Sequence, residues 1–186
     1  MSVPYEKWHF SVSEYYRMAE AGVISPQDHV ELIEGEVVKM SPIGSRHAAC
    51  VRRLDALLNS QAGQLAQVSV QSPVRLDDFS EPEPDVALLR PRDDFYAEKH
   101  PRPEDVLLII EVADTSVEYD RSIKLPLYAR ANIPQILIVD LPAEVIESYT
   151  EPLNGAYQKF IRARRGESVE LISLSNVTIS VDVVLG

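Results

Sequence analysis

The sequence predicts a mixed α/β domain in which helices pack on a central sheet. Two predominantly apolar runs, residues 106–112 and 135–140, are typical of buried strands. A stretch with helical character separates them, and the chain beyond residue 145 favours further strands. At 186 residues the chain suits one domain, residues 1–186, with a sizeable core.

Two elements are expected near the N-terminus. Residues 11–22 begin with a serine and end with a glycine, as a short amphipathic helix does. Residues 30–34 and 36–40 are strand-like and flank Gly35, so they predict a hairpin with a tight turn.

Residues 45–62 are expected to form the longest helix. Four of its residues are spaced to lie on one stripe: His47, Val51, Leu54 and Leu58. Because this stripe faces the sheet, a core histidine is favoured over a chemical role for His47. Cys50 is expected to be a buried small hydrophobe without chemistry.

The remaining elements follow from apolar runs and turn residues. A helix is expected between residues 117 and 131, where Pro126 either falls in the first turn or kinks the interior. Strands are expected at residues 67–76, 85–89, 106–112, 135–140, 145–149 and 157–161, and the tail to residue 184 adds more. The strand 106–112 is apolar on both faces, so it should be central.

The overall charge opposes a nucleic-acid partner. Eighteen basic residues against 29 acidic ones leave a net charge of −11, whereas nucleic-acid-binding proteins are usually basic. Two local basic clusters offset this in part: Arg46, Arg52 and Arg53, and Arg162, Arg164 and Arg165. A solvated face is the favoured interpretation of each cluster.

Composition also bounds the location. The longest apolar run, residues 106–110, is far too short to cross a membrane, and the first residues lack a signal-peptide pattern. The single cysteine excludes an intrachain disulfide framework and a multi-cysteine metal site. We therefore expect a cytoplasmic protein with no membrane partner.

Two carboxylates at the edges of apolar runs indicate a chemical site. Asp85 opens one strand-like run and Glu111 closes another, and Lys124 follows in the next helix. Strand alternation puts Glu111 on the face shared by Leu107, Ile109 and Ala113, with Val106, Leu108, Ile110 and Val112 on the opposite face. Carboxylates there are costly to bury unless they are paired, protonated or bound to a cation.

This arrangement could hold a hard divalent cation and polarise a water for phosphodiester hydrolysis. The residues alone support equally well a Glu111 that is solvated at its strand end, or one that pairs with Lys124 or Arg121.

The order Pro84-Asp85, Glu111, Lys124 resembles the PD-(D/E)xK nuclease superfamily. More narrowly, the chain resembles the Uma-two family, described as putative restriction endonucleases. The resembling segments lie between residues 10 and 150: 30–36, 45–47, 71–74, 81–85, 110–116, 119–121, 124–128 and 133–141. The resemblance implies a restriction-endonuclease-like mixed sheet flanked by helices, with an N-terminal helix and hairpin and a β-rich C-terminal portion.

The resemblance also implies roles. Asp85 and Glu111 would ligate Mg²⁺ or Mn²⁺ together with the backbone carbonyl of Val112. The usual motif lysine would fall at Ala113, so a migrated lysine, Lys124, would orient the attacking water or stabilise the transition state. Asp120 and Tyr128, four residues to either side, could orient Lys124 along one helical face.

Two residues are weaker candidates for the site. Such folds often complete their metal site with an N-terminal carboxylate, here Glu31, for which surface exposure is an equally supported alternative. His47 is the other.

The function expected is that of a metal-dependent endonuclease acting on DNA. One alternative is a non-catalytic regulatory or interaction protein on a nuclease scaffold, which the displaced lysine and the acidic surface favour. Another is a small-molecule phosphoesterase, which suits the net charge. We also expect a homodimer, because sheet edges need protection and many nucleases of this superfamily cut duplexes as dimers.

Overall fold

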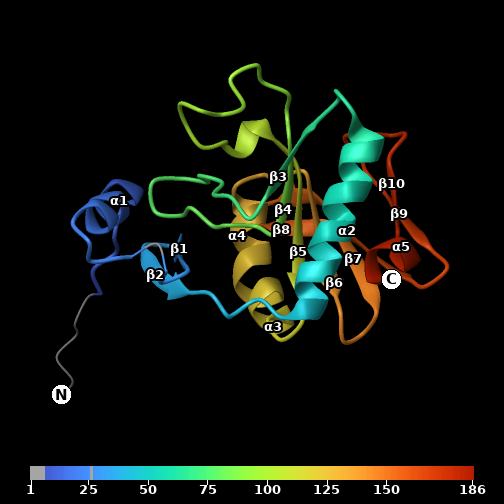
Figure 1. Ribbon diagram of the computed structural model, residues 1–186, viewed down its shortest axis with the longest axis horizontal. Helices are drawn as coiled ribbons and strands as arrows, with labels where there is room; N and C mark the ends of the chain where they lie inside the picture. The colour runs from blue at the N-terminus through green and yellow to red at the C-terminus, as the bar shows by residue number, and fades with distance from the viewer. Residues whose placement is uncertain (1–6, 26) are drawn as a thin grey trace.

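The computed structural model describes residues 7–25 and 27–186 (Figure 1). Its centre is a six-stranded sheet in the order β3-β4-β5-β6-β7-β8. The strands are β3 (Gln67–Val70), β4 (Val86–Leu89), β5 (Val106–Ala113), β6 (Gln135–Asp140), β7 (Val145–Leu153) and β8 (Ala156–Arg164). Strands β5 and β6 are parallel and the other neighbours are antiparallel, which confirms the mixed α/β fold predicted from the sequence.

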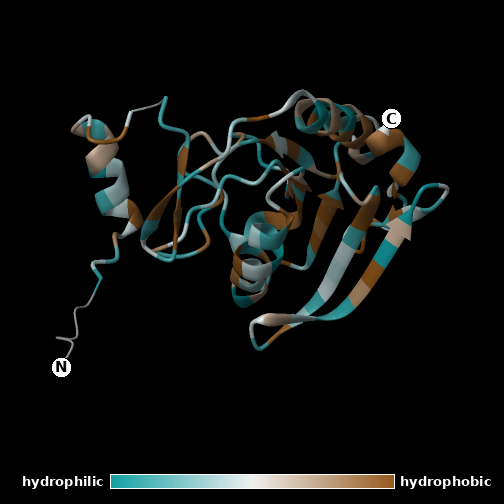
Figure 2. Ribbon diagram, turned by 90° about the horizontal axis from the view of Figure 1, so that it is seen from below, coloured by the Kyte–Doolittle hydropathy of each residue, from teal (hydrophilic) through white to brown (hydrophobic). Residues whose placement is uncertain are grey.

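Helices cover both faces of this sheet. Helix α2 (Ser45–Ala62) packs its buried residues against one face, where a hydrophobic cluster includes Leu54, Leu108 and Ile110. Helix α4 (Leu125–Arg130) lies on the other face, in a second cluster with Ile109. Figure 2 shows the apolar residues concentrated on the strands at the centre of the molecule. The central strands β4, β5 and β6 are therefore buried on both faces, as continuous apolar strands require.

The N-terminal helix and hairpin form as predicted. Helix α1 (Val12–Glu20) begins at a capping box formed by Ser11 and Glu14. Strands β1 (Val30–Ile33) and β2 (Glu36–Lys39) are joined by Glu34 and Gly35, whose positive φ angles of 49° and 79° suit a type I′ hairpin turn.

This hairpin is fastened to the loop that precedes β4. Leu32 bridges to Glu81, and the Gly35 N–H donates a hydrogen bond of 2.7 Å to the Phe79 carbonyl. These contacts hold β1 beside the ends of the sheet strands.

The crossover from β5 to β6 is helical but not regular. It consists of α3 (Val117–Tyr119), a π-helical segment η2 (Asp120–Lys124) and α4. Pro126 falls in the first turn of α4, one of the two positions predicted for it. The Leu125 N–H donates to the Asp120 carbonyl, five residues back, so the turn that carries Lys124 is wider than an α-helical turn.

Two predicted strands are wrong in extent. Residues 67–76 were expected to be extended, but β3 ends at Val70, because Gln71 has a φ of 45° and Pro73 cannot donate a ladder hydrogen bond. In the tail, β9 (Ser168–Glu170) and β10 (Thr178–Ser180) form a separate two-stranded sheet. Residues 181–184, expected to be strand, lie in the short helix α5 (Val181–Leu185).

The predicted alternation along β5 is also wrong at its start. The register with β4 shifts between Leu88 and Leu89, so that Leu89 pairs with Val106 and Leu107 is left out of the ladder. Val106 consequently packs in the same cluster as Ile109, whereas Leu107 packs in the opposite one. A bulge inserts one residue and reverses the faces, which a strict period of two cannot anticipate.

None of the helices within residues 7–25 and 27–186 is long and apolar enough to cross a membrane.

The hairpin turn yields a stability prediction. At Gly35 an added Cβ would lie 2.5 Å from the Cβ of His9, whereas at Gly22, also at positive φ, it would meet no described atom within 4 Å. We expect Gly22→Ala to cost about 1–2 kcal/mol from backbone strain alone. Gly35→Ala should cost about 1–3 kcal/mol more from the clash. Urea unfolding of both variants measures the difference, and equal costs would contradict the tight packing at the turn.

Candidate active site

Strand pairing brings the two predicted carboxylates to one end of the sheet. Asp85 lies one residue before β4, and Glu111 lies two residues before the end of β5. Val86 pairs with Ile110, so extending this antiparallel register by one residue places Asp85 opposite Glu111. The loop before β4 thus delivers Asp85 to the strand end that carries Glu111.

Lys124 enters this region from the crossover. Its Nζ lies 3.3 Å from Oε1 of Glu111 and 3.2 Å from Oε2 of Glu31. The side chains of Lys124, Glu111 and Glu31 are only 8%, 5% and 3% exposed. Of the alternatives open for Glu111, the contact with Lys124 is therefore the one that forms. The solvated Glu111 and the surface-exposed Glu31 are both wrong, because the hairpin and the crossover cover these side chains.

Arg121, the other partner considered for Glu111, is engaged elsewhere. Its Nη2 lies 2.8 Å from Glu147 and 2.9 Å from Asp140. Arg121 therefore binds the neighbouring strands β6 and β7 and leaves Glu111 to Lys124.

Two further side chains support the ion-pair cluster. The Tyr128 hydroxyl donates a hydrogen bond of 2.6 Å to Oε1 of Glu111, and the Ser116 hydroxyl donates one of 2.8 Å to the buried Asp120. The spacing of four residues around Lys124 predicted that Asp120 and Tyr128 lie near it, but not that Tyr128 binds Glu111. The buried Tyr119 hydroxyl, in contrast, has no hydrogen-bond partner among the described residues.

Asp85 is fixed by donors from three segments. Its Oδ2 accepts hydrogen bonds from the Val112 N–H at 2.9 Å and from the ring of His47 at 3.0 Å. Its Oδ1 accepts a longer one, of 3.4 Å, from Gln71. The residue next to Glu111 therefore ties the Asp85 carboxylate to the end of β5.

His47 is not the satisfied core histidine that the apolar stripe favoured. The ring is half-buried on α2, and its Nδ1 is buried without a hydrogen-bond partner in the described part of the chain. The hydrogen bond to Asp85 raises the pKa of His47, and the nearby Asp114 and Asp120 add to this. The stripe predicted the direction of the ring but not its carboxylate partner, which the loop before β4 supplies.

Burial and charge shift the ionisation of the cluster. Burial raises the pKa of Glu111 to about 8, and Asp120 and Asp85 act in the same direction against the opposing effect of Lys124. Burial alone would lower the pKa of Lys124, but the surrounding carboxylates, Glu111 foremost, raise it above its usual value. Lys124 is thus held as an ammonium. The nearby carboxyl groups of Glu111, Glu31 and Asp120 outnumber this lysine.

The donor set suits a hard divalent cation. Asp85 and Glu111 offer carboxylate oxygens at the ends of adjacent strands, and Mg²⁺ is commonly bound by one or two carboxylates with waters in its other positions. Within the described residues, no group of three or more His, Cys, Asp and Glu side chains is arranged to hold a metal ion. Protein ligands alone would therefore leave several metal positions to water or substrate.

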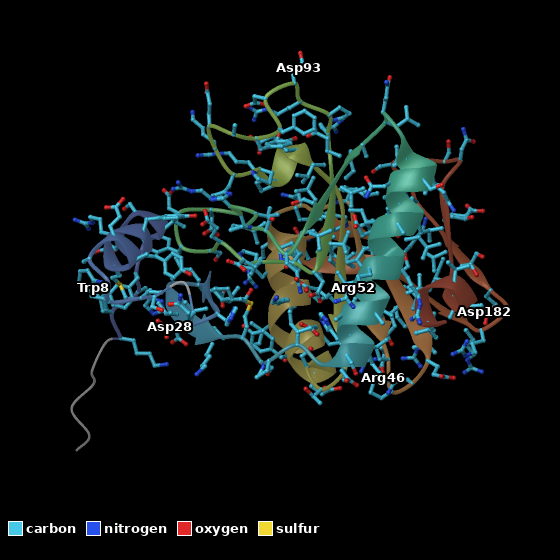
Figure 3. The ribbon with its side chains drawn as sticks, viewed as in Figure 1. Trp8, Asp28, Arg46, Arg52, Asp93 and Asp182 are labelled. Carbon is cyan, nitrogen blue, oxygen red and sulfur yellow. The ribbon has the colours of Figure 1, made fainter. Side chains whose placement is uncertain are left out.

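The two predicted basic clusters lie outside the group formed by Lys124, Glu111 and Glu31. Arg46 and Arg52 extend from α2 (Figure 3). Arg46 donates a hydrogen bond of 3.1 Å to the Leu141 carbonyl, and Arg53 donates one of 2.9 Å to the carbonyl of Leu185 in α5. Part of this first cluster thus serves to hold backbone carbonyls.

Comparisons with known proteins agree with this architecture. The model of the Uma2 family, described as "Putative restriction endonuclease", matches residues 12–182, so the chain belongs to the Uma2 family. This confirms the resemblance to the Uma-two family seen in the sequence. No curated protein matches the chain.

A solved structure shares the fold. It is the crystal structure of a putative nuclease belonging to DUF820 from Anabaena variabilis ATCC 29413. The TM-score is 0.74 over 95% of this chain and 97% of that chain, at 13% sequence identity. At this identity the likeness establishes the fold alone.

The raised pKa of Glu111 predicts that the metal-free protein loses stability as the pH rises. An unfolded glutamate titrates at about 4.3, so between there and about 8 the folded Glu111 keeps a proton that the unfolded chain has released. This contribution is complete below the unfolded pKa and falls by about 1.4 kcal/mol per pH unit until the folded pKa is passed. In EDTA, the Tm should fall by about 3–6 °C per pH unit between about pH 6 and pH 7.5.

Glu111→Gln should flatten this slope, because the amide imitates the protonated carboxyl at every pH. The raised pKa of His47 acts in the same direction, so the difference between wild type and variant is the quantity to compare. Glu118→Gln, at a glutamate that is 85% exposed, is the matched control and should keep the wild-type slope. An unchanged slope in Glu111→Gln would contradict the assignment.

Proposed function

We propose that this protein is a metal-dependent endonuclease that hydrolyses phosphodiester bonds of DNA. The observation that supports it best is the meeting of Lys124 with Glu111 and Glu31, beside Asp85, at one end of neighbouring strands. This supplies the carboxylates and the ammonium of the superfamily motif, although Ala113 occupies the usual lysine position. Membership of the Uma2 family and the shared nuclease fold support the same class.

Each residue then has a role in the proposed reaction. Asp85, Glu111 and the backbone carbonyl of Val112 would hold Mg²⁺ or Mn²⁺. When bound, such a metal lowers the pKa of a water and neutralises charge on the phosphate. Lys124 donates hydrogen bonds to the attacking water or to the phosphate oxygens, a contribution worth ~2.7–4 kcal/mol by analogy with an oxyanion-hole donor.

Four further groups position this machinery. Tyr128 and Lys124 both bind Oε1 of Glu111 and so fix its orientation. His47 and the Val112 N–H do the same for Asp85. Glu31 holds Lys124 from the side of the hairpin and helps to keep it charged.

The outer strands support the expected assembly. Strands β3 and β8 lie at the two edges of the six-stranded sheet. Pairing of such edges with a second copy protects them, so we include a cytoplasmic homodimer in the proposal. Light scattering that shows a monomer at tens of micromolar would remove the dimer.

Metal binding should raise the thermal stability. Adding Mg²⁺ or Mn²⁺ at about 100 times its Kd stabilises a folded protein by about 2.7 kcal/mol if the ion binds only the native state. Asp85→Asn should abolish this rise in Tm because it removes a ligand charge. Asp93→Asn, at an exposed position (labelled in Figure 3) beyond the opposite end of β4 from Asp85, should keep it. A rise that survives in both Asp85→Asn and Glu111→Gln would place the ion elsewhere.

Loss of the Lys124 ammonium should impair cleavage. Wild-type protein with Mn²⁺ or Mg²⁺ should nick or cleave plasmid DNA, and Lys124→Ala should be slower by at least about tenfold. Lys124→Gln serves as a companion variant, because its amide still donates to the two buried carboxylates. Lys99→Ala, at an exposed loop lysine, is the control. Circular dichroism establishes folding, and equal cleavage by wild type and both Lys124 variants would make this lysine structural.

A second candidate function is a non-catalytic role on the same scaffold. The burial of Lys124 and Glu111 favours it, because little of either side chain is open to a substrate. Absence of hydrolysis of DNA, RNA and a small phosphoester, measured while metal is bound, would favour this role over the nuclease.

A further inference from the structure

The arginines of β8 line a pocket beside the candidate active site. The pocket has a volume of about 530 Å³ and is formed mainly by the turn from β6 to β7, the end of β8 and η2. Four arginines line it together with two carboxylates: Arg121, Arg162, Arg164, Arg165, Asp140 and Glu144. Its lining is therefore positive, although the chain as a whole carries a charge of −11. We name this feature the arginine pocket.

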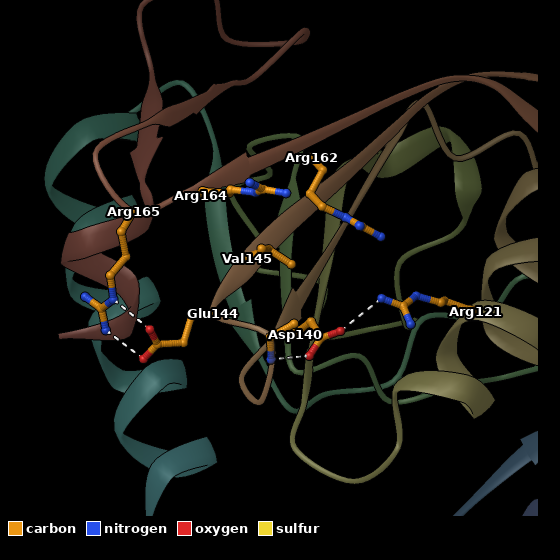
Figure 4. Close-up of a pocket in the computed structure, with 8 residues that line it drawn as sticks. Arg121, Asp140, Glu144, Val145, Arg162, Arg164 and Arg165 are labelled. Carbon is orange, nitrogen blue, oxygen red and sulfur yellow. Dashed lines mark hydrogen bonds and ion pairs between the residues drawn. The ribbon is translucent and has the colours of Figure 1, made fainter.

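Most of these guanidinium groups are held in place by carboxylates. Arg162 and Arg121 both contact the fully buried Glu147, at 2.6 and 2.8 Å, and Arg165 contacts Glu144 at 3.1 Å. Figure 4 shows Arg121 and Arg165 at opposite sides of the pocket. These ion pairs build a rigid frame of positive groups, since each guanidinium has more donors than one carboxylate can accept.

Arg164 is the exception in this frame. Among the described residues its guanidinium has no ion pair and no hydrogen bond, and the side chain is exposed. Arg164 and Arg162 are two positions apart on β8, so they lie on the same face of the strand. In Figure 4 both extend over the pocket, with Arg164 directed toward Arg162. A cation in this position offers a planar set of donors that matches a phosphate.

The arginine pocket is connected by two short links to the carboxylate cluster, by which we mean Glu31, Asp85 and Glu111 around Lys124. Arg121 precedes Lys124 by three residues in η2, and Asp140 pairs with Ala113, two residues after Glu111 on β5. Two residues of strand span about 7 Å, and a nucleic-acid strand advances about 3.4 Å per nucleotide along its axis. A phosphate in the pocket would thus lie a few nucleotides from one at Glu111.

We propose that the arginine pocket binds a backbone phosphate of the nucleic-acid strand, with Arg164 as the main donor and Arg162 beside it. This inference rests on the proposed nuclease function and names the surface that holds the substrate. It also explains how a chain with a net negative charge binds an anionic partner. The acidic surface repels the strand elsewhere, and this pocket sets where it can approach.

Binding without hydrolysis tests the proposal. A fluorescein-labelled duplex is titrated with the full chain in EDTA, and fluorescence anisotropy gives the affinity over a series of salt concentrations. Each phosphate contact contributes about 0.9 to the slope of log K against log salt concentration on duplex DNA. Arg164→Ala should weaken binding and lower the slope by about that amount. Arg164→Glu should weaken binding further, and Arg164→Lys, which keeps the charge, should recover most of the slope.

A matched control is Arg102→Ala, an exposed arginine just before β5 and therefore at the opposite end of that strand from Glu111. It should leave affinity and slope unchanged. Wild-type affinity and slope in Arg164→Ala and Arg164→Glu would overturn the proposal. Calorimetric binding of inorganic phosphate that is lost in Arg164→Ala, with duplex binding intact, would assign the pocket to a small anion and also overturn it.

The two proposals fail separately. Because the binding assay contains no metal, an absence of cleavage contradicts the nuclease function and leaves the phosphate contact supported. Conversely, normal cleavage with an unchanged salt slope in the Arg164 variants supports the nuclease and rejects the pocket.

Discussion

The ammonium of Lys124, buried between Glu31 and Glu111, is the interaction on which the rest of the site depends. Moving such charges out of water costs several kcal/mol per ion, and only close opposite charges and hydrogen bonds offset this. The lysine meets two carboxylates at 3.2 and 3.3 Å. It thereby joins three elements that are distant in sequence: the β1–β2 hairpin, the end of β5 and the crossover helix. Removing the lysine would leave two buried carboxyl groups, those of Glu31 and Glu111, without their shared cation.

The crossover geometry allows this contact. The π-helical turn ends at Lys124, and Pro126 follows two residues later in α4, so the chain changes helical geometry where the lysine must reach the sheet. Tyr128, one turn later, reaches the same carboxylate. In open sheets, ligands bind beyond the carboxyl ends of parallel strands. Strands β5 and β6 are parallel, and both the carboxylate cluster and the arginine pocket lie at their carboxyl ends.

The acidic and the basic groups at this end of the sheet are therefore separated from each other. Carboxyl groups in excess gather around Lys124, where a metal ion would relieve their repulsion. Arginines in excess gather toward the β8 edge, where Glu147 of β7 anchors Arg121 and Arg162. The net charge of −11 describes neither region. Four arginines share one pocket, so a local positive surface exists that the overall composition does not indicate.

Several features followed from the sequence by itself. The apolar runs of β5 and β6 were long enough to predict buried central strands, and the glycine at residue 35 predicted the hairpin turn. The order of Asp85, Glu111 and Lys124 pointed to the family and to the residues that the structure brings to one end of the sheet. Apolar runs and turn residues are local signals, and the family resemblance depends on the order of residues along the chain. Neither kind of signal requires knowledge of which segments pack together.

Only the tertiary structure decided the partners of the charged groups. The bulge opposite Leu89 reversed the faces at the start of β5, and the turn at Gln71 ended β3 early. His47 lay on an apolar stripe and Glu31 in a short hairpin, so periodicity left their environments open. The register of β4 with β5 and the path of the crossover determine that His47 meets Asp85 and that Glu31 meets Lys124. The physical reason is that the spacing of residues in the sequence indicates which face of their own helix or strand they share. Burial and the pairing of charged groups depend instead on segments many residues away.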